Sequence, residues 1–249
     1  MVAAPSAANS PRLLLLWDVD HTLIETRGVG RAIYDRAFPA ATGVALTRLA
    51  TIAGRTELDI MEESLRVNGV EPTIERIAIL ASALTLGYQS AREELGRIGR
   101  ALPGAEKTLA SLATEPAIHQ TVVTGNLREV ARIKLEVFGL DRYVDLTSGA
   151  YGDDDKERVN LVALSRRRAS ARTGVEFGAD ATILLGDTPN DVEAGLAAGV
   201  HVVGVATGKT SAALLMAAGA HEVTNDLHGC HAIVSRLVRE GLNHCGGTL

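Results

Sequence analysis

Two aspartates follow a short apolar run near the start of the chain. Residues 13–17 read LLLLW, and Asp18 and Asp20 come directly after them, separated by one valine. Two carboxylates this close repel each other unless a cation joins them, and Mg2+ commonly takes one or two carboxylates together with phosphate oxygens. A D-x-D pair therefore indicates a metal site, although a strand that ends in a turn-forming aspartate accounts for so short a pattern equally well.

Two other segments end apolar runs on groups that suit the same chemistry. TVVTGN offers the hydroxyl of Thr124 and the backbone N–H groups of Gly125 and Asn126 at the start of a predicted helix, where phosphoryl groups bind. ILLGDTPND ends on Asp187, and Asp191 follows four residues later. Ordinary helix caps explain much of both segments, but a cap leaves Asp187 without a role.

A cation is also required, because phosphoryl transfer spreads negative charge over the phosphoryl oxygens. In YGDDDKERVNLVAL, Lys156 and Arg158 open a predicted helix after an acidic loop. Both are candidates for the catalytic cation, and we prefer Lys156 slightly from its spacing to the apolar face of the following helix.

The elements that must position these side chains follow from the hydrophobic pattern. Short apolar runs predict strands at residues 13–17, 120–123, 143–146, 182–185 and 201–205, and helical patterns alternate with them. This alternation predicts an α/β fold, a Rossmann-like doubly wound parallel sheet with helices on both faces. Ligands of such sheets bind beyond the carboxyl ends of the strands, which is where the aspartates fall.

One connection is far too long for a simple crossover. The first predicted strand ends before Asp18 and the second begins near Gln120, and the residues between them show helical patterns. We predict an inserted all-helical cap domain at residues 26–100 and an α/β catalytic core made of residues 13–25 and 101–249. Residues 1–12 are predicted to be a disordered tail.

The motifs occur in the order D-x-D-x-T, T-G-N, a cation, then G-D-x-x-x-D, from Leu13 to about Gly208. This set resembles the haloacid dehalogenase superfamily of aspartate-nucleophile phosphohydrolases, specifically members like phosphoglycolate phosphatase that carry a helical cap. The resemblance implies that Asp18 is the nucleophile and that Asp20 is the general acid and base. It also implies that Thr124 binds the phosphoryl group.

The same resemblance implies a magnesium cofactor and further binding residues. The expected metal ligands are Asp18, Asp20 and Asp187, with Asp191 supporting them. Gly125 and Asn126, at the predicted helix start, are expected to bind the phosphoryl group beside Thr124. His21 stands where the family usually has glycine. We expect His21 to fill the turn, and a hydrogen bond to the phosphoryl group is the other option.

Substrate selectivity is expected to come from the cap. In TIAGRTELDI, Gly54 permits a turn and Arg55 offers a planar guanidinium that suits a carboxylate or phosphate. The alternative is a surface arginine at a helix start.

These features predict a magnesium-dependent phosphomonoester hydrolase that acts on a small phosphorylated metabolite through an aspartyl-phosphate. A phosphosugar mutase of the same superfamily is one alternative, and a non-enzymatic phospho-acceptor or binding module is another. Within the superfamily, phosphonate-cleaving relatives need a cap lysine, and residues 26–100 contain no lysine.

Composition limits the partners and the location. The formal net charge is −5, which argues against binding nucleic acid, and no apolar run is long enough to span a membrane. Cys230 and Cys245 are the two cysteines, so no disulfide framework is expected and a cytoplasmic location fits. Their spacing to the nearby histidines matches no zinc pattern. Aromatic residues make up 3% of the chain, which favours a small acid or sugar over a nucleotide.

Overall fold

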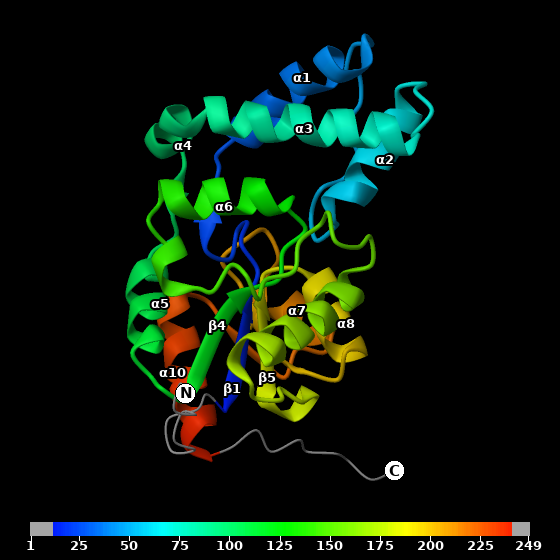
Figure 1. Cartoon of the computed structure of the whole chain (residues 1–249). Helices are drawn as coiled ribbons and strands as arrows, with labels where there is room; N and C mark the ends of the chain where they lie inside the picture. Colours follow the sequence, from blue (N-terminus) through cyan, green and yellow to red (C-terminus); the bar gives the residue numbers. More distant parts are fainter. Residues whose placement is uncertain (1–11, 241–249) are drawn as a thin grey trace, which may run out of the picture.

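The computed structural model describes residues 12–240. Residues 1–11 and 241–249 lie outside this range, so the predicted disordered tail, except for Arg12, and Cys245 near the end of the chain are not described. Two layers make up the molecule: a sheet with flanking helices, and a group of helices stacked over one end of that sheet (Figure 1).

The sheet is parallel and has five strands in the order β4-β1-β5-β6-β7. The strands are β1 (Leu13–Trp17), β4 (Ile118–Val122), β5 (Thr182–Gly186), β6 (His201–Val205) and β7 (Glu222–Thr224). Strand β1 pairs with β4 on one side and with β5 on the other, and all five of its residues are buried. Because β1 has neither a free edge nor a solvated face, its sequence is an unbroken apolar run.

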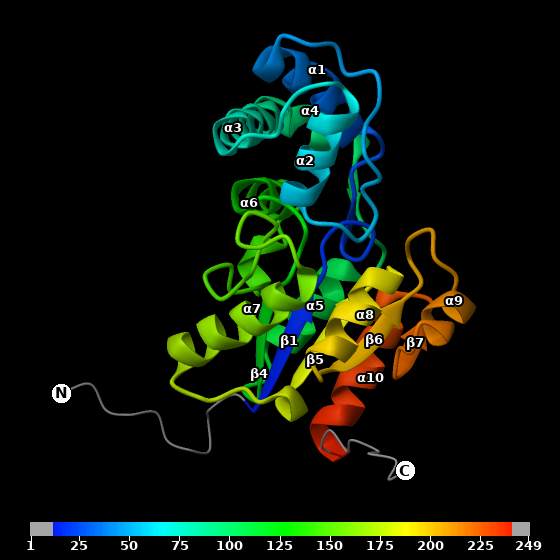
Figure 2. The same cartoon turned by 90° about the vertical axis from the view of Figure 1, so that its right-hand side faces the viewer.

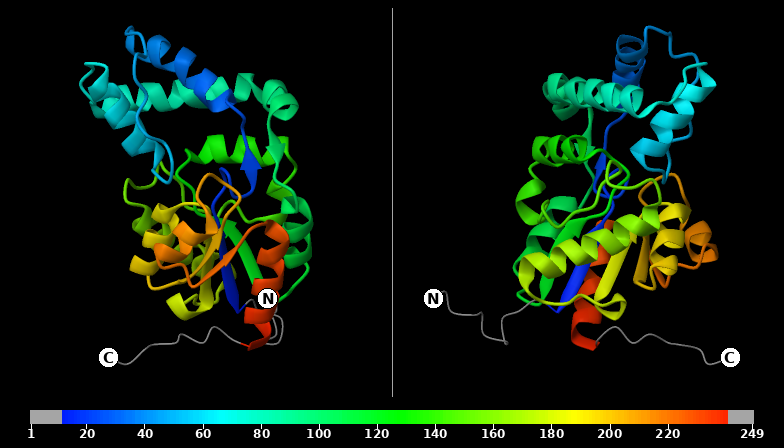
Figure 3. Two further views of the ribbon diagram at one scale, coloured as in Figure 1. Left: turned by 180° about the vertical axis from the view of Figure 1, so that it is seen from behind. Right: turned by 45° about the vertical axis from the view of Figure 1, so that its right-hand side comes forward.

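Side chains of β1 alternate between two helical layers. Leu15 and Trp17 pack in one hydrophobic cluster with α5 (Ala105–Ala113) and α10 (Leu227–Glu240). Leu14 and Leu16 pack in another with α7 (Arg158–Thr173), on the opposite face. Helix α8 (Pro189–Ala197) packs beside α7, and α9 (Ala212–Ala217) packs against β6 and β7. The predicted Rossmann-like α/β core is therefore confirmed (Figure 3).

Four helices between β1 and β4 form the second layer. They are α1 (Val29–Thr42), α2 (Glu57–Val67), α3 (Ile74–Ser90) and α4 (Arg92–Ile98). We call residues 26–100 the helical insertion. The chain enters it through β2 (Ile24–Glu25) and leaves through β3 (Arg100–Ala101), and these two short strands pair in antiparallel fashion. Figure 2 shows the insertion standing over the sheet, with α6 (Arg128–Val137) between them.

The insertion has its own hydrophobic cluster. Ile33 and Phe38 of α1, Leu65 of α2 and Leu80 of α3 are buried in it, and Ile133 of α6 closes the cluster from below. Helical spacing of these apolar residues is what predicts a helical insertion. Helices α3 and α4 are separate, because α3 ends at Ser90 and α4 begins at Arg92.

Two strand predictions differ from the structure. The strand predicted at 143–146 is wrong: a 3-10 turn at Asp141–Tyr143 is followed by irregular chain. The Asp145 carboxylate accepts hydrogen bonds from the backbone N–H and the hydroxyl of Thr147, which bends the chain out of the sheet. Strand β7, short and only partly buried, was not predicted. Within residues 12–240, no helix combines the length and apolarity required to cross a bilayer.

Candidate active site

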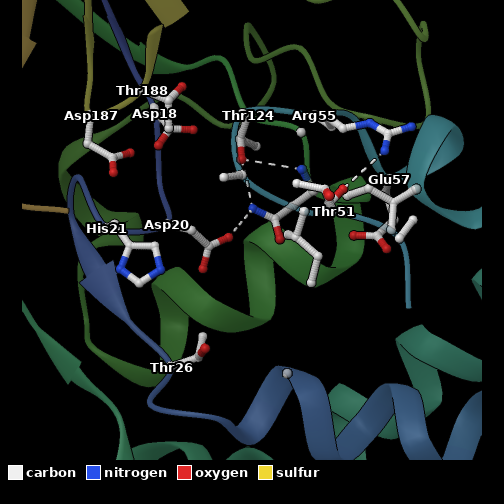
Figure 4. A pocket seen from close by; sticks show the side chains of 18 of the residues that line it. Asp18, Asp20, His21, Thr26, Thr51, Arg55, Glu57, Thr124, Asp187 and Thr188 are labelled. Atoms are coloured by element: carbon white, nitrogen blue, oxygen red, sulfur yellow. Dashed lines mark hydrogen bonds between the residues drawn. The ribbon is translucent and has the colours of Figure 1, made fainter. Parts of the chain in front are cut away.

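Loops from the carboxyl ends of the strands and from the insertion enclose a cavity of about 560 Å³. Asp18 follows β1, Thr124 follows β4 and Asp187 follows β5, so one edge of the sheet supplies all three. Arg55 and Glu57 line the cavity from the insertion (Figure 4). The motifs therefore meet at one edge of the sheet, as the order of strands and motifs predicts.

Three carboxylates lie together at the floor of the cavity. Asp18, Asp187 and Asp191 are buried, and each offers an oxygen within 4.8 Å of the other two. The Thr22 hydroxyl donates to Asp18 Oδ2 at 3.1 Å and lies 3.5 Å from Asp187 Oδ1. We call Asp18, Asp187 and Asp191, with Arg158, the carboxylate cluster.

Arg158 is the cation of this cluster. Its Nη2 donates to Asp18 Oδ1 at 2.7 Å and lies 2.5 Å from Asp191 Oδ1. Arg158 is the first residue of α7, and Leu161 and Val162 follow it by three and four residues, so all three lie on one face of the helix. That face packs on the sheet, which is why the Arg158 side chain is buried. Residue spacing along α7 therefore favours Arg158.

Lys156 lies elsewhere, which reverses the order of preference that the sequence suggested. It precedes α7, its side chain is 46% exposed, and its ammonium pairs with Glu62 of the insertion. Lys156 is also absent from the residues that line the cavity. The expected spacing to the apolar face of α7 is met by Arg158, two residues after Lys156.

The cluster carries more negative charge than Arg158 offsets. Three ionised carboxylates and one guanidinium sum to −2. Burial, reinforced by the neighbouring carboxylates, raises the pKa of Asp18 to about 7 and that of Asp187 to about 8. Asp191 Oδ2 accepts from the backbone and hydroxyl of Thr188, while its Oδ1 and the Nε of Arg158 lack an aligned hydrogen-bond partner.

This donor set fits a divalent cation. Three buried carboxyl groups share one guanidinium, and their hard oxygen ligands are the kind that a divalent cation such as magnesium prefers. The carboxylate oxygens that converge belong to Asp18, Asp187 and Asp191, whereas the Asp20 carboxylate is bonded to Lys134, so metal binding by Asp20 stays a prediction.

Asp20 belongs to a second polar group, which we call the Lys134 network. Lys134 Nζ donates to both carboxylate oxygens of Asp20, at 2.9 and 2.7 Å, and to Asn126 Oδ1 at 2.6 Å. Asn126 Nδ2 in turn donates to Asp20 Oδ2 and to Thr124 Oγ1, each at 2.7 Å. Burial alone would raise the pKa of Asp20, but Lys134 and Asn126 together hold it below its usual value.

Sequence reasoning missed Lys134, although a signal was present. Lys134 lies on α6 four residues after Val130 and three after Ala131, among the buried positions of that helix. A lysine on the apolar face of an amphipathic helix requires a partner, since lysine is almost never fully buried unpaired. The partner here is Asp20.

The insertion contacts the core beside the phosphoryl-binding motif. The backbone N–H of Glu57 donates to Gly125 O at 2.7 Å, and a Cβ on Gly125 would lie 2.0 Å from Arg55 O. Gly125 therefore permits this close approach, which is a packing reason for glycine beside any role in binding. Gly54 has φ 69°, as the predicted turn requires.

Arg55 lines the cavity, but its guanidinium is already engaged. It pairs with Asp59 at 2.6 Å and with Glu63, and it donates to Thr51 O at 3.2 Å. In Figure 4 Arg55 and Asp20 are labelled on opposite sides of the cavity. Binding of substrate by Arg55 stays a prediction, and it would require the guanidinium to exchange partners.

His21 occupies a turn with φ 62°, an uncommon conformation for a residue with a side chain. Its carbonyl accepts a hydrogen bond from Thr207 Oγ1 at 2.7 Å, so the turn is tied to the loop after β6. The ring faces the cavity near Asp20 (Figure 4). This conformation agrees with the expectation that His21 fills the turn, and it leaves the ring available to a ligand.

Comparison with known families identifies the family of the chain. The family model described as haloacid dehalogenase-like hydrolase matches residues 15–205, a span that contains every strand motif described above. The chain belongs to this family. No curated protein sequence matches it significantly.

Solved structures share the fold of this hydrolase. A predicted phosphatase from Clostridium acetobutylicum is 20% identical with a TM-score of 0.68, covering 92% of this chain and 100% of its own. A predicted phosphoglycolate phosphatase from Haemophilus somnus is 18% identical with a TM-score of 0.63, covering 90% and 98%. A protein described as a β-phosphoglucomutase from Bacteroides vulgatus is 18% identical with a TM-score of 0.62, covering 92% and 90%. At these identities the similarity concerns the fold.

Proposed function

We propose that this hydrolase is a magnesium-dependent phosphomonoesterase in which Asp18 is the nucleophile. The observation that carries the proposal is the position of the Asp18 carboxylate, which lies on the cavity floor bonded to Arg158 and Thr22 beside Asp187 and Asp191. Arg158 and Thr22 orient the carboxylate toward the cavity, and the cluster can accept a cation. A small phosphorylated metabolite fits the cavity volume of about 560 Å³.

In the first step, an Asp18 oxygen attacks phosphorus while the bond from phosphorus to the leaving oxygen breaks. Asp20 gives its proton to that oxygen, and the phosphoryl group becomes an aspartyl-phosphate on Asp18. Thr124 and Asn126, joined by hydrogen bonds beside Asp20, are placed to bind the phosphoryl oxygens. Magnesium held by Asp18, Asp187 and Asp191 would neutralise part of the phosphoryl charge.

In the second step, water attacks phosphorus and the bond to Asp18 breaks, while Asp20 accepts a proton from the water. Lys134 lowers the pKa of Asp20 in the free protein, which suits this role as base. A bound phosphoryl dianion places negative charge beside Asp20 and so raises its pKa, which suits the role as acid in the first step. One carboxylate can thus serve both steps.

The helical insertion is proposed to act as a cap that excludes bulk water from these steps. It meets the core through Glu57 and Gly125, directly over the phosphoryl-binding motif. The free thiol of Cys230 is buried, in keeping with the proposed cytoplasmic location.

Hydrolysis of p-nitrophenyl phosphate tests the proposal. We expect turnover with Mg2+, loss of turnover with a chelator, and release of inorganic phosphate, which separates a hydrolase from a mutase. Asp18→Asn should lower turnover by about 10^4 or more, as loss of a nucleophile does. Asp180→Asn is the matched control, since Asp180 is exposed and precedes β5 at the end of the sheet away from the site. Full activity of Asp18→Asn would place the nucleophile elsewhere.

A further inference from the structure

The part of the cavity formed by the insertion is built around a second acidic side chain, Glu57. Glu57 is the first residue of α2, and its carboxylate accepts a hydrogen bond from the hydroxyl of Tyr34 on α1. Thr51, which lies beside Glu57 in Figure 4, and Thr26 add two hydroxyl groups to the cavity lining. Tyr88 of α3 adds an aromatic ring. Glu57 lines the same cavity as Asp18, so the leaving group of a phosphate bound at Asp18 can extend toward Glu57.

Cations near Glu57 are committed to other acids. Lys134 is bonded to Asp20 and Asn126, and Arg158 is bonded to Asp18. Arg55, two residues from Glu57 in sequence, pairs with Asp59 and Glu63. Within the part of the chain that the structure describes, no ion pair to Glu57 is found.

The charge in this half of the cavity is therefore negative. Lys134 cancels Asp20, and an ionised Glu57 then adds one uncompensated negative charge. Burial raises the pKa of Glu57, while the hydrogen bond from Tyr34 and the charge of the nearby Lys134 oppose that rise. Lys209 and Arg31 also line the cavity, but both are exposed at its rim, where water screens their charge.

A leaving group that carries a carboxylate would meet like charge here and lose its water without compensation. A hydroxyl can donate to Glu57 and accept from a tyrosine or threonine hydroxyl, which satisfies both partners. An ammonium has donors but no acceptor, so it can pair with Glu57 but cannot accept a hydrogen bond from the tyrosine and threonine hydroxyls around it. A hydroxyl group satisfies both kinds of partner and is therefore the better match.

We infer that Glu57, oriented by Tyr34, selects a phosphate ester whose leaving group is an uncharged polyol or sugar and rejects one that bears a carboxylate. This inference rests on the proposed phosphatase function and names the substrate class of the same site. It departs from what a phosphoglycolate phosphatase-like assignment implies, because the glycolate leaving group is a carboxylate.

The test compares three small phosphate esters of similar size on the full chain with Mg2+. They are glycerol 3-phosphate, 2-phosphoglycolate and O-phosphoethanolamine, which carry a neutral diol, a carboxylate and an ammonium. We expect kcat/KM for glycerol 3-phosphate to exceed that for each of the other two by at least about tenfold, since a mispaired polar group in a binding site is costly. Equal or higher kcat/KM for 2-phosphoglycolate or O-phosphoethanolamine would overturn the inference.

Glu57→Gln removes the charge and keeps an acceptor for Tyr34. We expect it to lower the ratio of kcat/KM for glycerol 3-phosphate over 2-phosphoglycolate by about tenfold. Tyr34→Phe removes the hydrogen-bond donor that orients Glu57 but keeps the carboxyl group, so it should lower the same ratio by a smaller factor. Glu75→Gln is the matched control, because Glu75 is exposed on α3 of the same insertion, and the ratio should not change.

The outcomes separate this inference from the function on which it rests. Absence of turnover of every ester, p-nitrophenyl phosphate included, refutes the proposed phosphatase and the inference with it. Turnover of p-nitrophenyl phosphate with an unchanged ratio in Glu57→Gln refutes only the role of Glu57.

Discussion

The two aspartates of the D-x-D pair end in opposite surroundings. Asp18 joins two buried carboxylates and one arginine, and its pKa is raised to about 7. Asp20 is two residues away, bonded to Lys134 and Asn126, and its pKa is lowered. The carboxylate cluster thus keeps an excess of negative charge that a cation can satisfy, whereas the Lys134 network is already neutral.

This difference shows how one short motif can supply two chemical roles. A cluster with more carboxylates than cations is suited to bind metal and to present a nucleophile. A carboxylate paired with one lysine is suited to move a proton. The separation comes from two helices: α7 brings Arg158 to Asp18, and α6 brings Lys134 to Asp20. Each of the following predictions changes one side of the comparison.

Removal of the cation of the carboxylate cluster should have the largest effect. Arg158→Ala leaves three buried carboxylates without their partner, and we expect turnover of p-nitrophenyl phosphate to fall by roughly 10^2 to 10^3. Lys156→Ala is the control, since Lys156 pairs with Glu62 outside the cavity, and it should change turnover by less than about threefold. A larger loss in Lys156→Ala than in Arg158→Ala would restore Lys156 as the catalytic cation.

The second prediction concerns pH and stability of the metal-free protein. Asp18 and Asp187 have folded pKa values of about 7 and about 8, above the unfolded value of 3.8. Between the unfolded and the folded pKa values, the folded protein binds more protons than the unfolded chain. Its free energy of unfolding therefore falls as pH rises from about 4 to 8. We expect a loss on the order of 4 kcal/mol, the value for one group whose pKa rises from 3.8 to about 7 at about 1.4 kcal/mol per unit, because the two coupled groups share one site and do not contribute independently.

Thermal unfolding with a chelator and with Mg2+ measures this effect. Tm of the chelated protein should be several degrees lower at pH 8 than at pH 5, and Mg2+ should raise Tm more at pH 8. Asp187→Asn should weaken both dependences, because it removes one of the repelling charges. A metal-free Tm that rises across this range would show that the cluster is not short of positive charge.

Breaking the Lys134 network should cost less than breaking the cluster. Lys134→Met leaves Asp20 unpaired, and we expect a loss of about 2 kcal/mol in stability, below the value for a fully buried pair because the Asp20 side chain is 35% exposed. Turnover should fall roughly tenfold or more as Asp20 loses its orientation. Chemical denaturation and steady-state kinetics report the two effects.

A double variant makes that prediction specific to the pair. Lys134→Met combined with Asp20→Asn should recover part of the lost stability, because no charge is left without a partner. Lys107→Met is the matched control, since Lys107 is exposed on α5 and its loss should leave stability and turnover nearly unchanged. Strict additivity of the two stability losses would show that Lys134 does not act through Asp20.

Most of the fold was predictable because its signals are local. LLLLW predicted a central strand, and helical spacing of apolar residues predicted the insertion between two strands of one sheet. The strand ends then placed Asp18, Thr124 and Asp187 at one edge. Strand β7 was missed because its three residues are partly exposed and carry no apolar run.

The pairing between side chains was harder to predict from the sequence than the fold. Choosing between Lys156 and Arg158 required the phase of α7, and finding Lys134 required the knowledge that α6 packs beside Asp20. Glu57 and Arg55 illustrate the same limit. Both come from one short segment. Only the fold shows that Arg55 pairs with acidic residues of α2, while Glu57 lines the cavity with a phenol as its partner.

The smallest expected effect concerns the Thr22 hydroxyl, which donates a hydrogen bond to the carboxylate cluster. Thr22→Val keeps the shape of the side chain but removes the donor to Asp18 Oδ2, and we expect stability to fall by about 1 kcal/mol. Thr108→Val is the matched control, because Thr108 is also buried and donates to Leu227 O at 2.9 Å, on a helix outside the cavity. Both variants should therefore lose similar stability. Only Thr22→Val should lower turnover, by a few-fold, and strengthen the fall of Tm with pH, since Asp18 would then hold its negative charge with one donor fewer. Identical kinetics and identical pH dependence in the two variants would show that the Thr22 hydroxyl stabilises the fold without acting on Asp18.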